Sequence, residues 1–279
     1  MTTVADLLAP ARQRLAALPF AGAREALLLL GHVLGRDEAW LLAHGDDAVA
    51  SAHAERFRAL VQRRAHGEPV AYLTGAREFW GRDFTVDARV LVPRPETEHL
   101  VEAALRLAAT LPPRPRILDL GAGSGAIAVT LALELPEARV VAVDRSPGAL
   151  ALSARNARAL GATSLRLLAG DWAAALRVEE FDLLVSNPPY LDPQDPAVQR
   201  EVAAHEPPAA LFAGRGGLDA YRALLTSVVG ARPGTPLLLE LGAGQAPALR
   251  ALAPSRGWHL TAVVEDLAGI ERVAELQRY

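Results

Sequence analysis

The chain has 279 residues, of which 51% are hydrophobic, enough for one large domain or for a standard domain with a small one beside it. It carries 29 basic and 32 acidic residues, and the net charge of −3 lacks the positive balance of a tight duplex binder. The absence of cysteine excludes disulfides, thiolate catalysis and zinc–thiolate sites.

Other classes of protein are also disfavoured by what the sequence lacks. The 7 histidines are scattered without the spacing of metal ligands, so no metal is expected. No apolar run approaches the roughly 18 residues of a membrane span. Asp6 and an early helical pattern argue against a signal peptide. We therefore expect a cytoplasmic protein that does not associate with a membrane.

Helical periodicity dominates the first part of the chain. Val4 to Leu18 place their apolar side chains on one face, Thr3 and Asp6 resemble a capping box, and Pro19 ends the helix. Further helices are predicted over residues 23–34, with Gly35 as a left-handed stop, over residues 38–43, and from Ser51 to a close at Gly67. These helices indicate a small bundle, and we assign residues 1–76 to an N-terminal helical domain.

A change of pattern follows this bundle. Phe84 and Val86, then Val90 and Val92, alternate as in strands and favour a short β-hairpin, which we take as a linker over residues 77–94. The next helix is predicted to begin at Pro95. Arg94, just before it, is either part of the entry to this helix or a lid residue near a ligand pocket.

The next predicted unit is a strand, a glycine-rich loop and a helix. A strand begins at Arg116 and runs into Gly121, Ala122, Gly123, Ser124 and Gly125. The glycines let the backbone pass close to a ligand, and the N–H groups of the helix start can face it. The loop alone does not distinguish a dinucleotide from S-adenosylmethionine.

Two further strands end in side chains that could hold a nucleoside. The strand over residues 139–144 ends in Asp144, which could accept the ribose hydroxyls or cap the helix from Pro147. A short strand over residues 164–168 leads to Asp171 and Trp172. Trp172 could pack on an adenine ring and Asp171 could reach its amino group, although an aromatic residue in this place is as often the edge of a core.

The strand around Leu183, Leu184 and Val185 runs into a corner formed by Asn187, Pro188, Pro189 and Tyr190. Two prolines cannot continue the ladder of hydrogen bonds, so the chain must turn outward at the carboxyl end of the strand, where open α/β sheets bind ligands. An amide oxygen and a proline carbonyl held side by side can bind an –NH2 group. An ordinary exit from a strand is the alternative. The tetrapeptide is typical of enzymes that methylate planar amino or amide nitrogens, and alone it does not choose between a DNA base and a protein amide.

The remaining strands complete a sheet. A fifth strand is predicted over residues 236–241, and residues 258–264 and 272–279 form a final pair with a turn at Ala268 and Gly269. Strands that alternate with helices and end in a hairpin indicate an α/β fold, doubly wound and mainly parallel with an antiparallel edge. We assign residues 95–279 to this domain.

Several longer motifs together resemble one family. They read Gly-Glu-Pro-Val-Ala-Tyr-Leu-Thr-Gly, Arg-Glu-Phe-Trp-Gly, Val-Pro-Arg-Pro-Glu-Thr-Glu, Ile-Leu-Asp-Leu-Gly-Ala-Gly-Ser-Gly-Ala-Ile, Val-Ser-Asn-Pro-Pro-Tyr and Glu-Pro-Pro-Ala-Ala-Leu. From about Gly67 onward the chain closely resembles the bacterial peptide chain release factor glutamine N5-methyltransferases, the PrmC proteins. The bundle before Gly67 fits that family only in size and helical character.

This resemblance implies a class I S-adenosylmethionine-dependent methyltransferase fold, with a seven-stranded sheet, joined by a hairpin to a helical substrate-recognition domain. It implies methyl transfer to the glutamine of the Gly-Gly-Gln loop of release factors, with S-adenosylhomocysteine as product. We expect the enzyme to be a monomer. The glycine loop, Asp144, Trp172 and Asn187 would contact the cofactor, and residues 187–190 would hold the glutamine. His205, Gly216 and Glu265 depart from the family pattern, which affects the loop after the site.

Two other functions stay open at this point. A nucleic-acid amino methyltransferase, for instance one acting on adenine N6, shares the Asn-Pro-Pro-Tyr corner. The acidic balance and the lack of a recognisable target-reading domain disfavour it, because base flipping is costly without one. A non-catalytic cofactor-binding or ribosome-associated module is disfavoured by the intact loop, acid and corner.

Overall fold

The chain divides into two units, which this computed structural model describes over residues 1–16, 18, 22–195 and 204–279. The first unit is built from Met1–Ala76 and also includes His205. The second is built from the chain that begins at Arg77 and ends at Tyr279. Each has its own hydrophobic core, and the two are described separately below.

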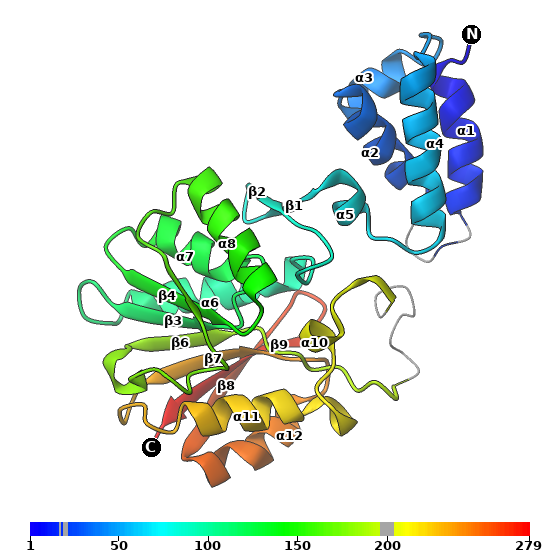
Figure 1. Cartoon of the computed structure of the whole chain (residues 1–279). Coiled ribbons are helices and arrows are strands. Elements are labelled where there is room, and N and C mark those ends of the chain that lie inside the picture. Colours follow the sequence, from blue (N-terminus) through cyan, green and yellow to red (C-terminus); the bar gives the residue numbers. More distant parts are fainter. Residues whose placement is uncertain (17, 19–21, 196–203) are drawn as a thin grey trace. The chain divides into compact units, whose positions relative to one another are not determined.

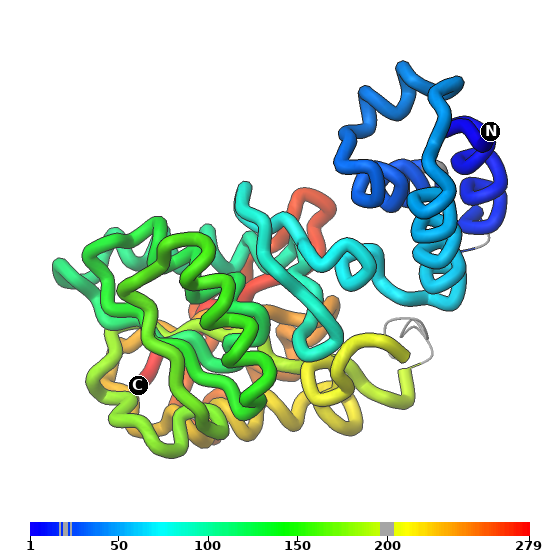
Figure 2. Tube along the Cα trace, turned by 45° about the horizontal axis from the view of Figure 1, so that its top comes forward, coloured from blue at the N-terminus to red at the C-terminus, as the bar shows by residue number. Residues whose placement is uncertain are grey.

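The first unit is a bundle of short helices, drawn from blue to cyan in Figures 1 and 2. Its elements are α1 (Val4–Leu15), α2 (Ala23–Leu34), α3 (Glu38–Ala43), α4 (Ser51–Ala65) and α5 (Val70–Thr74). Thr3 and Asp6 form the predicted capping box, and Gly35 ends α2 with φ 64°. The first helix ends three residues before Leu18, and Pro19 lies outside the described residues. Leu7, Leu30 and Phe57 fill the core between the helices.

The hairpin after this bundle lies further upstream than the sequence suggested. Its strands are β1 (Ala76–Phe79) and β2 (Arg82–Thr85). The prediction of a second strand through Val90 and Val92 was therefore wrong. Trp80 and Gly81 form the turn with φ 54° and 68°. Two central residues with positive φ give the two-residue turn that matches the twist of paired strands. Val90 and Val92 are buried instead in an irregular segment.

A seven-stranded sheet organises the second unit, as expected from the resemblance. The strand order is β5-β4-β3-β6-β7-β9-β8, with β9 antiparallel to both of its neighbours and the other pairs parallel. The strands are β3 (Arg116–Leu120), β4 (Arg139–Asp144), β5 (Arg166–Ala169), β6 (Leu183–Ser186), β7 (Pro236–Glu240), β8 (Trp258–Glu265) and β9 (Glu271–Arg278). The doubly wound, mainly parallel sheet with an antiparallel edge is thus confirmed.

Helices cover both faces of this sheet (Figure 1). They are α6 (Glu98–Ala108), α7 (Ala126–Glu134) and α8 (Pro147–Leu160) on one face and α11 (Asp219–Ser227) and α12 (Ala246–Leu252) on the other. Short helical turns complete the unit: η1 (Pro95–Thr97), η2 (Val178–Glu180), α10 (Pro208–Leu211), η3 (Arg215–Gly217) and η4 (Ala253–Arg256). Alternate strand residues face opposite layers, so Ile117 packs under α7 while Leu118 packs under α11.

The strand order places the ends of β3 and β6 side by side. From β3 the chain proceeds to β4 and β5 on one side, whereas β6 and β7 lie on the other. The carboxyl ends of two such strands open into a crevice, where α/β proteins bind their ligands. The glycine loop leaves β3 and the Asn-Pro-Pro-Tyr corner leaves β6, so both predicted motifs arrive at this crevice. Within the described part of the chain, every helix is too short or too polar to span a lipid bilayer.

Candidate active site

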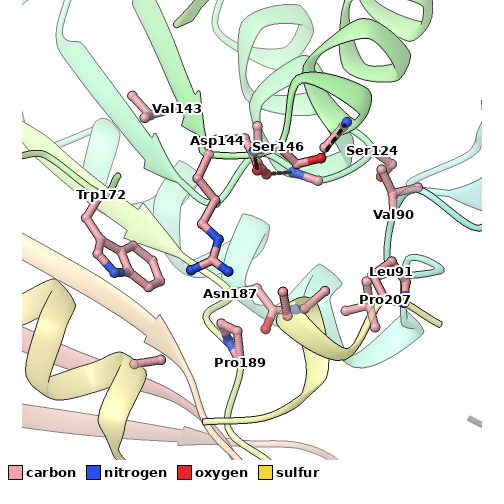
Figure 3. Close-up of a pocket in the computed structure, with 18 of the residues that line it drawn as sticks. Val90, Leu91, Ser124, Val143, Asp144, Ser146, Trp172, Asn187, Pro189 and Pro207 are labelled. Atoms are coloured by element: carbon pink, nitrogen blue, oxygen red, sulfur yellow. Dashed lines mark hydrogen bonds between the residues drawn. The ribbon is translucent and has the colours of Figure 1, made fainter. Parts of the chain in front are cut away.

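A cavity of about 450 Å³ lies at the carboxyl ends of the central strands. Its lining includes the loops after β3, β4, β5 and β6, together with residues 89–94 and the segment around α10. Figure 3 shows Trp172 on one side, Val90 and Leu91 on the other, and Asn187 and Pro189 below Asp144. A volume of this size lies in the range of small-molecule and cofactor sites.

The glycine loop forms one wall of this cavity. Gly121, Ala122, Gly123 and Ser124 line it. The N–H groups of Gly121 and Ala122 donate to the carbonyl of Val143 at 2.8 and 2.9 Å, which ties the loop to the end of β4. Gly121 and Gly123 have φ values of 94° and 53°, which residues with a Cβ rarely adopt.

Gly125, the fifth predicted loop residue, has another structural position. It is not among the described residues that line the cavity, and it caps the N-terminus of α7 with φ 84°. A Cβ atom there would lie 2.4 Å from the hydroxyl oxygen of Ser153 on α8. Gly125 therefore allows two helices to approach closely behind the loop.

Asp144 ends β4 and lines the cavity. Its carboxylate accepts the N–H of Gly123 at 2.9 Å and the N–H of Ser146 at 2.8 Å. Helix α8 is capped by the hydroxyl of Ser146, which accepts the N–H of Ala149, so Asp144 is not the capping residue. Asp144 orders the glycine loop and still has lone pairs for a ligand.

Asp171 and Trp172 follow β5 and both line the cavity. Trp172 has φ 48°, an uncommon conformation for an aromatic residue and one that occurs often at functional sites. A Cβ atom on Gly121 would lie 4.0 Å from the indole, so the missing side chain leaves a slot between loop and ring. Trp172 also packs against the core beneath the cavity. It is therefore both a residue at the edge of the core and a part of the cavity wall.

Asn187 and Pro189 bring the corner after β6 to the cavity, whereas the buried Pro188 and the half-buried Tyr190 are not among its described lining residues. The side-chain nitrogen of Asn187 donates to the hydroxyl of Thr97 at 3.2 Å. This orientation leaves the amide oxygen of Asn187 free to accept a hydrogen bond. The hydrogen bond to Thr97, the last residue of η1, thus orients the amide so that its oxygen is the available acceptor.

Tyr190 is anchored away from the cavity at both of its polar ends. Its hydroxyl donates to Glu240 at 3.2 Å, and its carbonyl accepts the side-chain N–H of Gln245 at 2.9 Å. Burial, and after it the charge of Glu240, raises the pKa of the Tyr190 hydroxyl. The phenol therefore stays protonated and fixes the end of the corner.

Arg94 lines the cavity and forms an ion pair with the carboxylate of Glu206. The other oxygen of Glu206 accepts the N–H of Val92 at 3.0 Å. The side chain of Glu206 is fully buried, whereas that of Arg94 is partly exposed. Glu206 therefore holds residues 92–94 in place as part of the cavity wall, and Arg94 faces both this anchor and the cavity.

Sequence reasoning missed several residues of this region. Thr97 and Glu240 were seen only as parts of a helix entry and a strand end, and Val90 and Leu91 were placed in a hairpin. The sequence offered one signal, for Glu240: an acidic residue at the carboxyl end of an apolar strand, where functional side chains of parallel sheets often lie. No spacing rule links Thr97 to Asn187, because these residues are 90 positions apart.

Known proteins resemble this chain over nearly its full length. Family models match residues 6–75 as a PrmC N-terminal domain and residues 98–207 as a methyltransferase small domain. The release factor glutamine methyltransferase of Xylella fastidiosa (strain 9a5c) is 48% identical over 251 residues, which cover 89% of this chain and 90% of that protein. The protein of the same name from Bordetella pertussis (strain Tohama I) is 46% identical over 277 residues and 98% of both chains.

The chain belongs to the release factor glutamine methyltransferase family. The helical region before Gly67, which the motifs left open, is included in this relationship. A methyltransferase structure from Pyrococcus furiosus is similar in fold, with a TM-score of 0.50 and 16% identity over 78% of this chain and 98% of that one. The class I methyltransferase fold is therefore confirmed.

Three positions that depart from the usual family pattern lie outside the cavity lining. Gly216 has φ 73°, and its N–H donates to Asp192 at 2.7 Å, so glycine suits the turn of η3. Glu265 is exposed at the end of β8. His205 bonds through its ring Nε2 to the carbonyl of His66 at 3.0 Å within the first unit.

Proposed function

We propose that this protein transfers a methyl group from S-adenosylmethionine to the side-chain nitrogen of the glutamine in the Gly-Gly-Gln loop of peptide chain release factors. The observation that carries this proposal is the position of Asn187. Its amide lines the same cavity as the glycine loop, and its nitrogen is bonded to Thr97 while its oxygen has no hydrogen-bond partner among the described residues. The names of the relatives support the substrate.

The residues around the cavity fit the cofactor. Gly121 and Gly123 leave space where a Cβ would stand, Asp144 offers carboxylate oxygens for ribose hydroxyls, and Trp172 offers a flat ring for adenine. Asp171 lies next to that ring and can accept from an amino group. Bound S-adenosylmethionine would supply an electrophilic methyl group attached to a positively charged sulfur. When the methyl group leaves, this sulfur becomes the neutral thioether of S-adenosylhomocysteine.

Asn187 and Pro188 orient the glutamine in this proposal. An amide nitrogen is a poor nucleophile because its lone pair is delocalised into the carbonyl. The oxygen of Asn187 and the carbonyl of Pro188 accept its two N–H bonds, align the nitrogen and stabilise the positive charge that develops on it. Pro189 limits the space around the planar amide, and Tyr190 fixes the end of the corner from outside the cavity lining instead of packing over the amide as the sequence suggested. Arg94 lies at the entrance for the substrate.

No general base with a shifted pKa is required by this scheme. The glutamine nitrogen gains the methyl group and then loses one of its protons to water. The scheme also requires no metal ion, because the electrophile carries its own positive charge.

We also propose roles for the larger parts of the chain. The helices of residues 1–76 would recognise the body of the release factor, residues 77–94 would link them to the catalytic domain, and residues 95–279 would carry the reaction. The match of the first region to a PrmC N-terminal domain supports this division. A cytoplasmic, monomeric enzyme without nucleic-acid contacts agrees with the substrate and with the net charge of −3.

Mass spectrometry of a purified release factor, incubated with the protein and S-adenosylmethionine, tests the proposal. We expect one added methyl group on the loop glutamine, and none when that glutamine is replaced by asparagine. DNA and RNA oligonucleotides are incubated side by side with the release factor. Methylation of an oligonucleotide in place of the release factor would instead identify a nucleic-acid amino methyltransferase.

A further inference from the structure

A buried asparagine of helix α8 connects two segments that lie outside that helix. Asn156 is 1% exposed and is not among the described residues that line the cavity. Helix α8 packs against both α7 and the hairpin strand β2 (Figure 1). The loop before α7 and the end of β2 therefore both lie near this side chain. Asn156 has no role in the proposed reaction, and a polar side chain is rarely buried so completely unless it binds specific partners.

The amide of Asn156 makes three hydrogen bonds, all of them to backbone groups. Its oxygen Oδ1 accepts the N–H of Thr85, at the end of β2, at 2.9 Å. Its nitrogen Nδ2 donates to the carbonyl of Thr85 at 2.9 Å and to the carbonyl of Ser124 at 2.8 Å. A backbone N–H can only donate and a carbonyl can only accept, so these partners determine the orientation of the amide. The reversed orientation would break all three bonds.

One of these bonds restrains the glycine loop. Ser124 belongs to that loop, lines the cavity and is buried. The start of the loop is bonded to the end of β4, and the N–H of Gly123 donates to Asp144 at 2.9 Å. The carbonyl of Ser124 is bonded to Asn156 instead. The loop is therefore fixed at its beginning by β4 and at its end by α8.

The close contact between α8 and the loop leaves this side chain little room to move. Ser153, three residues before Asn156 on α8, is buried. A Cβ atom on Gly125 would lie 2.4 Å from the hydroxyl oxygen of Ser153 and 3.3 Å from its Cβ. The backbone of the loop thus packs directly against α8, and the short side chain of Asn156 is enough to reach the carbonyl of Ser124.

The other two bonds of Asn156 restrain the start of a second cavity wall. Thr85 is the last residue of β2, and the chain then continues into the segment over residues 89–94 that lines the cavity. One side chain therefore restrains two walls of the same cavity. A loop rich in glycine has many conformations available, and restraining it before the ligand arrives lowers the entropy that binding must remove.

We propose that Asn156 is a positioning residue which holds the glycine loop and the start of the segment over residues 86–94 in the arrangement that binds S-adenosylmethionine. This inference rests on the part of the proposed function that names the cofactor. Asn156 acts only through the backbone of Thr85 and Ser124. Its contribution belongs to the preorganisation of the cofactor site, so its loss should weaken cofactor binding and leave turnover at saturating cofactor unchanged.

Two substitutions that keep the branched shape of asparagine provide the test. Asn156→Leu removes all three hydrogen bonds, whereas Asn156→Asp keeps an acceptor for the N–H of Thr85 and removes both donors. We expect each variant to raise the Kd of S-adenosylmethionine in calorimetry about 10-fold, with kcat at saturating cofactor within about 2-fold of wild type. Asn156→Ser leaves space for water to replace the amide. It should fold even if the other two variants do not, and its Kd should lie between theirs and that of wild type.

Leu152→Ala is the matched control on the same helix. Leu152 is a buried residue of α8 and is not among the described residues that line the cavity. Its truncation removes packing from α8 and should lower the melting temperature at least as much as the substitutions of Asn156. Well below that temperature nearly all of the protein stays folded, so Leu152→Ala should keep the wild-type Kd. The comparison separates a loss of stability from a loss of preorganisation.

The inference is overturned if folded variants of Asn156 bind S-adenosylmethionine with the wild-type Kd, because Asn156 would then serve stability alone. It is also overturned if Leu152→Ala weakens binding as much as they do, or if kcat at saturating cofactor falls by as much as Kd rises. A wild-type protein that binds the cofactor but methylates no release factor contradicts only the proposed function. A wild-type protein that binds no S-adenosylmethionine contradicts both.

Discussion

Asn187 combines two requirements that few residues meet. Its backbone precedes a proline and is therefore directed to the extended region, and its side chain carries both a donor for Thr97 and an acceptor for a substrate. We expect Asn187→Ala to lower kcat about 100-fold, the usual cost of removing one oriented polar group from a site. The Kd of S-adenosylmethionine should change by less than about 3-fold. Equal losses in turnover and cofactor affinity would assign Asn187 to cofactor binding only.

Asp119 presents a different problem at the same scale, because it is 0% exposed and neither of its carboxyl oxygens has a hydrogen-bond partner among the described residues. Burial, with a smaller contribution from Asp144, raises its pKa to about 7, against 3.8 for an ordinary aspartate. The folded protein thus binds this proton more tightly than the unfolded chain does. The stability contributed by the neutral form is complete below pH 3.8 and is lost as the pH rises through 7.

Asp119→Asn removes this titration. Relative to wild type, the variant should gain free energy of unfolding between pH 4 and pH 7, by on the order of 3 kcal/mol, and the difference should stay constant above pH 7. Urea unfolding at a series of pH values measures the difference. Asp83→Asn, at an exposed position of β2 in the same unit, serves as the control and should differ from wild type by less than about 0.5 kcal/mol. A pH-independent difference for Asp119→Asn would show that this carboxyl is not neutral in the folded state.

At the scale of elements, the turn η3 limits how the corner can be placed. Gly217 has φ 67°, and a Cβ atom there would lie 2.1 Å from the carbonyl oxygen of Tyr190 and 2.7 Å from the nitrogen of Gln245. Gly217→Ala should therefore break the Gln245–Tyr190 bond, displace the corner and lower kcat more than 10-fold. The rate of methyl transfer to a release factor, compared between the variant and the wild type, measures the loss of turnover.

Gly216, the neighbouring glycine, offers a matched control. It has φ 73°, but nothing lies within 4 Å of the position of its Cβ. Gly216→Ala therefore adds the strain of a positive φ, about 1 kcal/mol, without the clash. It should lower the melting temperature slightly and leave kcat at the wild-type level. Similar kcat values in both variants would show that the contact of Gly217 with Tyr190 has no effect on the site.

The sequence predicted most elements because they follow local periodicity. Helix α2 and strand β4 have the predicted bounds, and β5 begins only two residues after the predicted start at Ser164. The hairpin was misplaced because alternation at Val90 and Val92 arises from burial in an irregular segment. The turn signal was Trp80 before Gly81, and tryptophan with positive φ is too rare to be expected.

The site was predictable only in its motifs. Gly121, Gly123, Asp144, Trp172 and Asn187 all line one cavity, because they end strands that are neighbours in a parallel sheet. The contacts behind the motifs depend on tertiary packing. Neither the bond from Asn187 to Thr97 nor the bond from Tyr190 to Glu240 follows from any sequence period.

At the scale of the whole molecule, the two units differ in how they are stabilised. The second unit has a large core on each face of its sheet and contains every described residue that lines the cavity. The described residues of the first unit form one core between short helices. In its helices, Arg64 is 8% exposed and donates to both carboxyl oxygens of Glu25 at 2.8 and 3.3 Å. Separate cores allow separate unfolding transitions.

Calorimetry of the full chain should therefore show two unfolding transitions, and S-adenosylmethionine should raise the temperature of only one of them. At a concentration of 100 Kd the ligand adds about 2.7 kcal/mol to the unit that binds it, or roughly 5–10 °C for a domain of this size. Arg64→Leu leaves the carboxylate of Glu25 without its ion-pair partner. This variant should lower only the melting temperature of the N-terminal unit, by several degrees. If ligand and substitution instead shift a single common transition, the two units unfold cooperatively, and binding energy in the cavity is transmitted to the N-terminal helices.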